Sequence, residues 1–284
     1  MKYGIKLVVN YLLGTDVVGR RLAVCPDDTF IVSYPRSGNT WARFLIANLL
    51  HPGLTVSFSN IERLIPDTSS QSSRALKRTP RPRMIKAHEY FDHRYRKILY
   101  IVRDPRDVAL SYYHFQRKYR QIADDFPLPS YVDDFVSGRL ISAGWGTWGE
   151  NVATWLSARG KDRNFLLLRY EDMKKNPMYE LERISAFLNV AANPQLLQRC
   201  VERSSVESMR ELEKLQSDEW VATRNRRKDI PFVRTAHSGG WRSQLPHDAV
   251  HRIETAWGDL MTTLQYELTG PSLRLAAGAG SRLR

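Results

Sequence analysis

The chain has 284 residues, of which 42% are hydrophobic, and its 43 lysines and arginines outnumber its 30 aspartates and glutamates to give a formal net charge of +13. This hydrophobic content excludes a disordered chain, and the length fits one large domain. The positive charge favours anionic partners, namely polyanions, acidic membrane surfaces or small anionic ligands. Cys25 and Cys200 lie far apart without metal-ligand spacing. We therefore expect no disulfide framework, no bound metal and a reducing compartment, the cytoplasm.

Residues 5–13 are apolar but too short and too interrupted to span a bilayer, and no signal-peptide cleavage site follows them. A helix that rests on a membrane or on a partner remains open, so a peripheral membrane contact is an alternative. Basic runs at residues 74–83 and 224–228 lack interleaved aromatic side chains. They favour mobile loops, and no specific nucleic-acid partner is expected.

Short apolar runs typical of buried strands occur at residues 30–33, 83–87, 98–102 and 165–169. Helical patterns occupy residues 40–50, 105–119, 148–158, 177–188 and 248–264, and the second has Asp104 as its N-cap. This alternation predicts an α/β fold, a single three-layer domain with a mostly parallel central sheet and helices on both faces. We place its core at about residues 28–268, with an N-terminal extension at 1–27 and a flexible tail at 275–284.

The first predicted strand runs into a turn that reads Pro-Arg-Ser-Gly at residues 35–38, and a helix follows. Unpaired N–H groups and the dipole at a helix start attract anions, and Arg36 adds a fork suited to phosphate or sulfate oxygens. The short polar side chains of Ser37, Asn39 and Thr40 accompany it. The turn therefore predicts a site for a phosphate-like group. It lacks the Walker string G-x-x-x-x-G-K-[ST], and an ordinary strand–turn–helix connection is the alternative.

Lys86 and His88 follow the second strand and share one face of an extended segment. The ordinary pKa of a histidine lies near neutrality, so His88 could act as a general base toward a hydroxyl or amine. A surface histidine beside a salt-bridging lysine is the alternative interpretation. Both residues lie where ligands of α/β folds bind, beyond the carboxyl ends of the strands.

Arg103 leaves the third strand at the start of a helix, and Ser111 lies two turns further along that helix. They form a second anion position, because the start of a helix attracts negative charge. Two such positions on neighbouring strands predict a ligand that carries phosphate groups at both ends. Arg106 and Asp107, which come next, are expected to form a solvated pair.

Tyr170 follows the fourth strand and could offer its hydroxyl or its ring to a nucleotide base. Trp41, in the first turn of the first helix, could stack on the same base. Both could equally be packed core aromatics, and the sequence leaves this open.

Together these blocks resemble the soluble sulfotransferases that use 3′-phosphoadenylyl sulfate (PAPS), the family that includes the cytosolic enzymes. Residues 34–41, which read Tyr-Pro-Arg-Ser-Gly-Asn-Thr-Trp, are similar to that family's 5′-phosphosulfate loop, and residues 101–113 to its 3′-phosphate segment. Lys86-Ala87-His88 is similar to the segment with the catalytic histidine, and residues 170–177 to a block whose tyrosine contacts adenine. The likeness covers about residues 30–242 in the family's order.

The resemblance implies a P-loop-like nucleotide-binding core. It also implies in-line transfer of the sulfuryl group from PAPS to a hydroxyl or amine, which leaves adenosine 3′,5′-bisphosphate (PAP), without a metal. His88 would be the base, and Lys86 and Arg36 would stabilise charge on the departing oxygen. Further residues would hold the donor: Arg36, Ser37, Gly38, Asn39 and Thr40 at the 5′-phosphate, Arg103, Ser111 and Arg234 at the 3′-phosphate, and Trp41, Tyr170 and Ser204 around adenine.

The chain departs from the family's pattern in three places. Arg36 stands where the family often has lysine, which keeps the charge but loses a compact point contact. Residues 232–241 keep only Arg234 and Trp241 of the family's late Arg-Lys-Gly and Gly-Asp-Trp segment, and Ser204 begins a segment that is threonine-led in the family. The dimerisation motif common near the C-terminus of the animal enzymes is not visible, so the oligomeric state stays open.

Two other functions fit parts of the sequence: a nucleotide or nucleoside kinase, and a non-catalytic binding protein that kept the fold. Long loops at residues 57–83, 88–96, 121–149 and 214–240 are expected to wall the acceptor site. Their aromatics favour a flat or lipid-like acceptor, and their basic residues favour an anionic sugar; the aromatics are Tyr90, Phe91, Phe126, Trp145 and Trp148. We expect a small-molecule, glycan or lipid acceptor rather than a protein.

Overall fold

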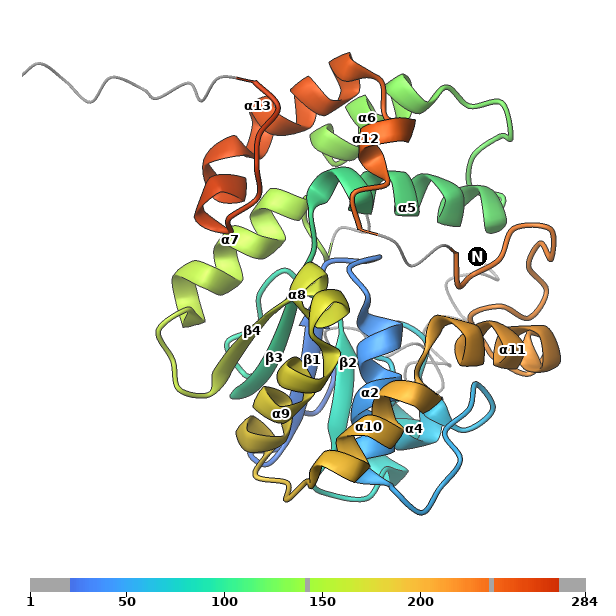
Figure 1. The fold of residues 1–284 in the computed structure, drawn as a ribbon, viewed down its shortest axis with the longest axis vertical. Helices are drawn as coiled ribbons and strands as arrows, with labels where there is room; N and C mark the ends of the chain where they lie inside the picture. Colours follow the sequence, from blue (N-terminus) through green and yellow to red (C-terminus); the bar gives the residue numbers. More distant parts are fainter. Residues whose placement is uncertain (1–20, 141–143, 235–237, 271–284) are drawn as a thin grey trace, which may run out of the picture.

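The computed structural model describes residues 21–140, 144–234 and 238–270. Four strands form one sheet in the order β2-β1-β3-β4, and every pairing is parallel (Figure 1). They are β1 (Thr29–Ser33), β2 (Met84–Ala87), β3 (Lys97–Val102) and β4 (Phe165–Arg169). The predicted strands are confirmed to within a residue at each end. Because all four run the same way, their carboxyl ends meet at one edge of the sheet.

Helices cover the sheet and include the five that the sequence predicts: α2 (Asn39–Leu50), α5 (Pro105–Lys118), α7 (Trp148–Arg159), α9 (Pro177–Leu188) and α13 (His247–Thr263). Asp104 is the N-cap of α5, as predicted, because its carboxylate accepts the backbone N–H of Arg106. Sequence analysis missed the other helices: α3 (Ile61–Leu64), α4 (Ser73–Arg78), α6 (Leu128–Ser137), α8 (Tyr170–Lys175), α10 (Pro194–Arg203), α11 (Val206–Gln216) and α12 (Trp241–Gln244). Several are single turns, too short to show a helical period.

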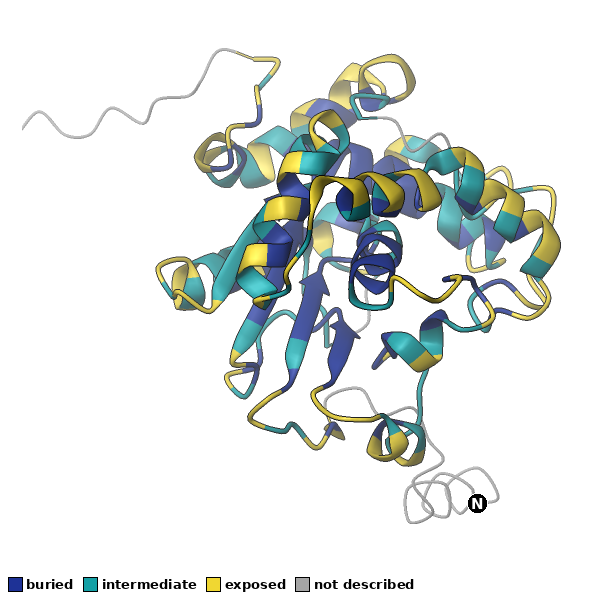
Figure 2. Cartoon of the chain, turned by 60° about the horizontal axis from the view of Figure 1, so that its bottom comes forward, coloured by how far each residue is buried: buried dark blue, intermediate teal, exposed yellow. Residues whose placement is uncertain are grey.

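Both faces of the sheet are buried, so the predicted three-layer arrangement is confirmed. On β1, Phe30 and Val32 pack into a core with residues of α5, α6, α7 and α13. Ile31 points the other way, into a second core with residues of α2, α9 and α10. Alternation along each strand therefore divides the apolar residues between two layers. Figure 2 shows most of the sheet as buried, and β4 at its edge is mostly of intermediate exposure.

Arg106 and Asp107 are not the solvated pair that the sequence predicts, since their exposed fractions are 1% and 3%. The Arg106 guanidinium pairs with Glu254 of α13 and lies 3.7 Å from the ring centroid of Trp241 in α12. The Asp107 carboxylate accepts the backbone N–H groups of Gly239 and Trp241. Together they tie the end of the chain to the start of α5, a contact that local sequence does not reveal.

The predicted extension and tail lie mostly outside the described residues, at 1–20 and 271–284, and so does the apolar stretch at 5–13. Their proposed boundaries stay predictions. Within the described ranges, no helix has both the length and the apolar character needed to cross a membrane.

Candidate active site

A cavity of about 940 Å³ opens where the strands end at their carboxyl edge. It is lined by residues that follow all four strands, so the predicted convergence is realised. The predicted site residues that line it are Arg36, Gly38, Asn39, Thr40, Trp41, Lys86, His88, Arg103, Ser111, Tyr170 and Arg234. Ser37 and Ser204 are both fully buried beside it.

The turn between β1 and α2 presents backbone to this cavity. Gly38 is the N-cap of α2 with a φ of 94°, and no side chain of the described residues caps this helix start. A Cβ atom at Gly38 would lie 2.4 Å from Cδ2 of Tyr170, so only glycine fits between the turn and that ring. The first N–H groups of α2 consequently remain available to an anion.

Two of the short polar side chains in this turn face the protein rather than the cavity. Asn39 donates from Nδ2 to Oγ of Ser33 at 3.0 Å, which fixes the end of β1 to the start of α2. The Ser37 hydroxyl is buried and has no hydrogen-bond partner among the described residues. Asn39 would therefore serve an anion through its backbone N–H, whereas the backbone N–H of Ser37 donates to the carbonyl of Tyr34 at 3.3 Å.

Three arginines from distant segments converge on the cavity. Arg103 donates from Nη1 to the carbonyl of Arg36 at 3.3 Å. Burial lowers the pKa of Arg36 to about 10, and the charges of Arg103 and Arg234 add to this shift. Burial, followed by the charge of Arg103, also lowers the pKa of Arg234. With a pKa of about 10, Arg36 nevertheless stays cationic at neutral pH, and an anionic ligand would relieve the repulsion among the three guanidinium groups.

The Arg36 side chain is clasped between two aromatic rings. Its guanidinium lies 4.8 Å from the ring centroid of Phe115 and 4.7 Å from that of Phe232. Its Nε donates to Oγ of Ser111 at 3.2 Å. A planar guanidinium can stack on both rings while it donates in plane, which an ammonium cannot do. The arginine at this position therefore fits its surroundings.

Two aromatic side chains, Trp41 and Tyr170, pack together beside Arg103. The rings of Trp41 and Tyr170 meet edge to face with centroids 5.8 Å apart, and Arg103 lies 4.3 Å from the Tyr170 centroid. Trp41 donates from Nε1 to the carbonyl of Ser204 at 2.9 Å, whereas the Ser204 hydroxyl accepts from Asn48. Ser204 therefore does not line the cavity itself, and it supports the lining residue Trp41 by this hydrogen bond.

His88 is held in one orientation. Its Nδ1 lies 2.7 Å from the carbonyl oxygen of Ser33, and an N–H at this atom leaves Nε2 with the lone pair. Burial, then the charge of Lys86, lowers the pKa of His88 to about 3. The imidazole is therefore neutral at physiological pH, as a general base must be.

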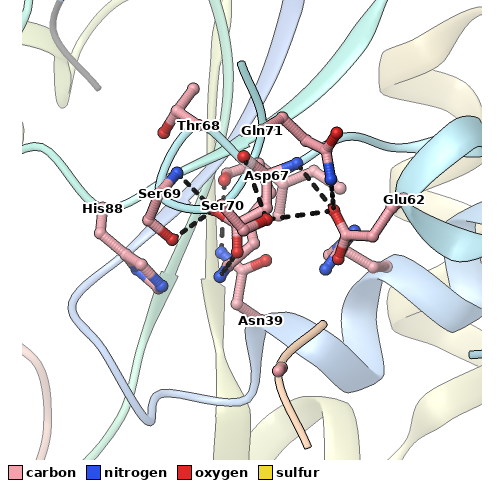
Figure 3. Close-up of polar contacts among 12 residues, drawn as sticks. Asn39, Glu62, Asp67, Thr68, Ser69, Ser70, Gln71 and His88 are labelled. Carbon is pink, nitrogen blue, oxygen red and sulfur yellow. Dashed lines mark hydrogen bonds and ion pairs between the residues drawn. The ribbon is translucent and has the colours of Figure 1, made fainter. Parts of the chain in front are cut away.

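Asp67 is a site residue that the sequence analysis missed. It lines the cavity, and its carboxylate forms a buried ion pair with the Lys86 ammonium. Figure 3 shows it between His88 and Glu62, with Ser69 and Ser70 beside it. Asp67 lies in a segment without helical or strand periodicity, so no sequence signal distinguished it from other loop acids.

The rest of the cavity is an aromatic chamber. Of the aromatics that the sequence analysis named, Trp145 lines it, whereas Trp148 is buried and donates from Nε1 to the carbonyl of Arg103. Tyr90, Phe91 and Phe126 are not among the lining residues. Further walls come from helix α5 and its C-cap, through Tyr112, Phe115 and Tyr119, and from the predicted wall segment 214–240, through Trp220 and Phe232.

Comparison with known proteins identifies the family of this chain. Residues 26–265 match the family described as the sulfotransferase domain. Sulfotransferase 1B1 of Canis lupus familiaris is 27% identical over 259 residues, which cover 85% of this chain and 86% of that protein. Sulfotransferase 1C2 of Homo sapiens is 30% identical over 203 residues, which cover 66% and 67% of the two chains. The resemblance drawn from the sequence blocks is therefore confirmed.

Two solved structures share the fold. Mouse sulfotransferase SULT7A1, complexed with PAP, superposes with a TM-score of 0.68 at 22% identity, over 86% of this chain and 87% of that one. Retinol dehydratase, in complex with androsterone and PAP, gives a TM-score of 0.69 at 21% identity, over 88% and 84% of the two chains.

Proposed function

The chain belongs to the sulfotransferase family, and from this premise we propose that it transfers the sulfuryl group of PAPS to a hydroxyl or amine. The observation that carries the proposal is the meeting of a cation cluster, an open helix start and a neutral histidine in one cavity. Family membership removes the kinase alternative.

The residues around the cavity fit the donor. The open start of α2 suits the 5′-phosphate, because its N–H groups are uncapped within the described chain and Gly38 keeps a side chain out of the way. Arg103, Ser111 and Arg234 suit the 3′-phosphate, since all three line the cavity and two of them are cations. Trp41 and Tyr170 would contact adenine, with Ser204 behind Trp41.

The cavity offers a residue of suitable chemistry both to the acceptor that loses a proton and to the oxygen that leaves sulfur. Bound PAPS supplies an activated sulfuryl group. His88 would accept the proton of the acceptor at Nε2 as the acceptor oxygen or nitrogen approaches sulfur, while Ser33 holds the ring through Nδ1. Lys86 and Arg36 would stabilise the charge that develops on the oxygen released from sulfur.

We propose a small-molecule, glycan or lipid acceptor that enters the aromatic chamber. The chamber supports this choice because stacked rings bury flat or apolar groups. Cys25 and Cys200 are free thiols, which fits the cytoplasmic location expected from the sequence.

Calorimetry with PAP, without magnesium and with ATP as the comparison ligand, tests the donor site first. We expect micromolar binding of PAP and much weaker binding of ATP. Transfer of labelled sulfate from PAPS to a panel of phenols, sugars, lipids and tyrosine peptides then tests the reaction. A preference for ATP, or transfer to the peptides alone, would contradict the proposal.

A further inference from the structure

The segment that carries Asp67 continues the sheet beyond β2. Asp67 forms an isolated parallel bridge with Lys86. The Lys86 N–H donates to the carbonyl of Pro66 at 2.8 Å, and the Lys86 carbonyl accepts the N–H of Thr68 at 3.0 Å. This pairing supports β2 at the point where Lys86 and then His88 emerge into the cavity.

Both carboxylate oxygens of Asp67 are engaged. Oδ2 accepts from the Lys86 ammonium, and Oδ1 accepts from the N–H and the hydroxyl of Ser69 at 2.8 and 2.6 Å (Figure 3). The backbone N–H of Asp67 in turn donates to Glu62, which pairs with the buried Arg43 of α2. These hydrogen bonds therefore hold the Asp67 carboxylate in one position, with its negative charge against the Lys86 ammonium.

Asp67 is suited to hold a charge rather than to accept a proton. Burial alone would raise the pKa of its carboxyl, but the positive charges of Lys86 and Arg43 outweigh burial and hold this pKa below its usual range. A carboxylate in this state stays ionised at neutral pH and has no free lone pair directed at an acceptor.

We propose that Asp67 is a positioning residue for sulfuryl transfer, which fixes the Lys86 ammonium where charge develops on the oxygen released from sulfur. The inference rests on the proposed function. Asp67 acts on the reaction through Lys86 and the end of β2, and it does not itself touch the reacting atoms.

This role predicts that the loss of the Asp67 carboxylate affects turnover and donor binding differently. Loss of the carboxylate frees Lys86 from its fixed geometry, so turnover should fall. The same change removes a negative charge from a cavity that receives an anion, so PAP should bind as well as before or more tightly. A residue that merely supports the fold would weaken both.

Asp67→Asn is the test variant, because asparagine keeps the shape and an acceptor for Ser69 but loses the charge. We expect kcat to fall about 10- to 100-fold, with a Kd for PAP no more than about threefold above that of the unaltered protein. Asp28→Asn is the matched control, since Asp28 forms a buried ion pair with Arg83 away from the cavity. It should keep kcat within about threefold even if its Tm falls.

A double-mutant cycle with Lys86→Met decides whether Asp67 acts through Lys86. In the Lys86→Met background, Asp67→Asn should cost less than about threefold in kcat. An unchanged kcat in the single variant, a Kd for PAP that rises with the loss of kcat, or fully multiplicative losses would overturn the proposal. If the unaltered protein binds PAP and transfers the sulfuryl group, any of these results overturns the role of Asp67 alone. If the unaltered protein neither binds PAP nor transfers the sulfuryl group, the proposed function is overturned as well.

Discussion

Replacement of Gly38 by alanine should damage the fold and the donor site together. Gly38 has a φ of 94°, and a Cβ atom there would lie 2.4 and 2.7 Å from Cδ2 and Cε2 of the Tyr170 ring. A left-handed backbone costs an L-residue about 1–2 kcal/mol, and overpacking costs about 1–3 kcal/mol. The free energy of unfolding should therefore fall by about 2–5 kcal/mol. For a domain of this size the Tm should drop by at least about 4 °C.

Donor binding should suffer because the Tyr170 ring must yield. Stacking of a base on an aromatic ring contributes about 1–3 kcal/mol, so PAP should bind about 5- to 150-fold more weakly. Thermal unfolding and calorimetry with PAP measure the two effects in one preparation. Gly53→Ala is the control, because a Cβ atom there would meet no described heavy atom within 4 Å. A Gly38→Ala protein with the Tm and PAP affinity of the Gly53→Ala protein would refute the reasoning.

Three further predictions concern His88 and Arg103. His88→Ala should lower kcat at least about 100-fold with little change in the Kd for PAP, as the loss of a base implies; near-normal turnover would remove His88 from its role. Arg103→Ala should weaken PAP binding by about 10- to 100-fold in calorimetry, because a charged contact to phosphate is lost, and an unchanged Kd would contradict its place at the 3′-phosphate. Burial and the charge of Lys86 lower the pKa of His88 to about 3 in the folded protein, from its ordinary value of 6.5. Between these pH values the unfolded chain binds the extra proton, so the free energy of unfolding should rise with pH by about 1 kcal/mol per unit, and denaturant titrations of His88→Gln should show a flatter slope.

Local patterns predicted the parts of the site that depend on neighbours in the chain. A run of apolar residues gives a buried strand, and Asp104 before Pro105 gives the start of a helix. Parallel strands then bring their ends to one edge, so Lys86, His88 and Arg103 were expected together before any contact was known.

The sequence did not predict the directions in which the side chains of the site point. The place of Ser204 around adenine stays a prediction, but the sequence did not indicate that its hydroxyl accepts from Asn48 and its carbonyl from Trp41. The direction of a side chain depends on which partners pack against it, and these partners lie 156 and 163 residues away along the chain. No local pattern carries that information.

The sequence by itself determined the strand ends, the glycine turn before α2 and the identity of the groups that meet there, because short-range preferences of the backbone decide them. Only the tertiary structure decided how those groups are held. It placed Arg36 between Phe115 and Phe232 and set Asp67 against Lys86. Such contacts form when separate layers of the fold pack together. A buried charge is then stable only with a partner, and that partner is distant in the chain.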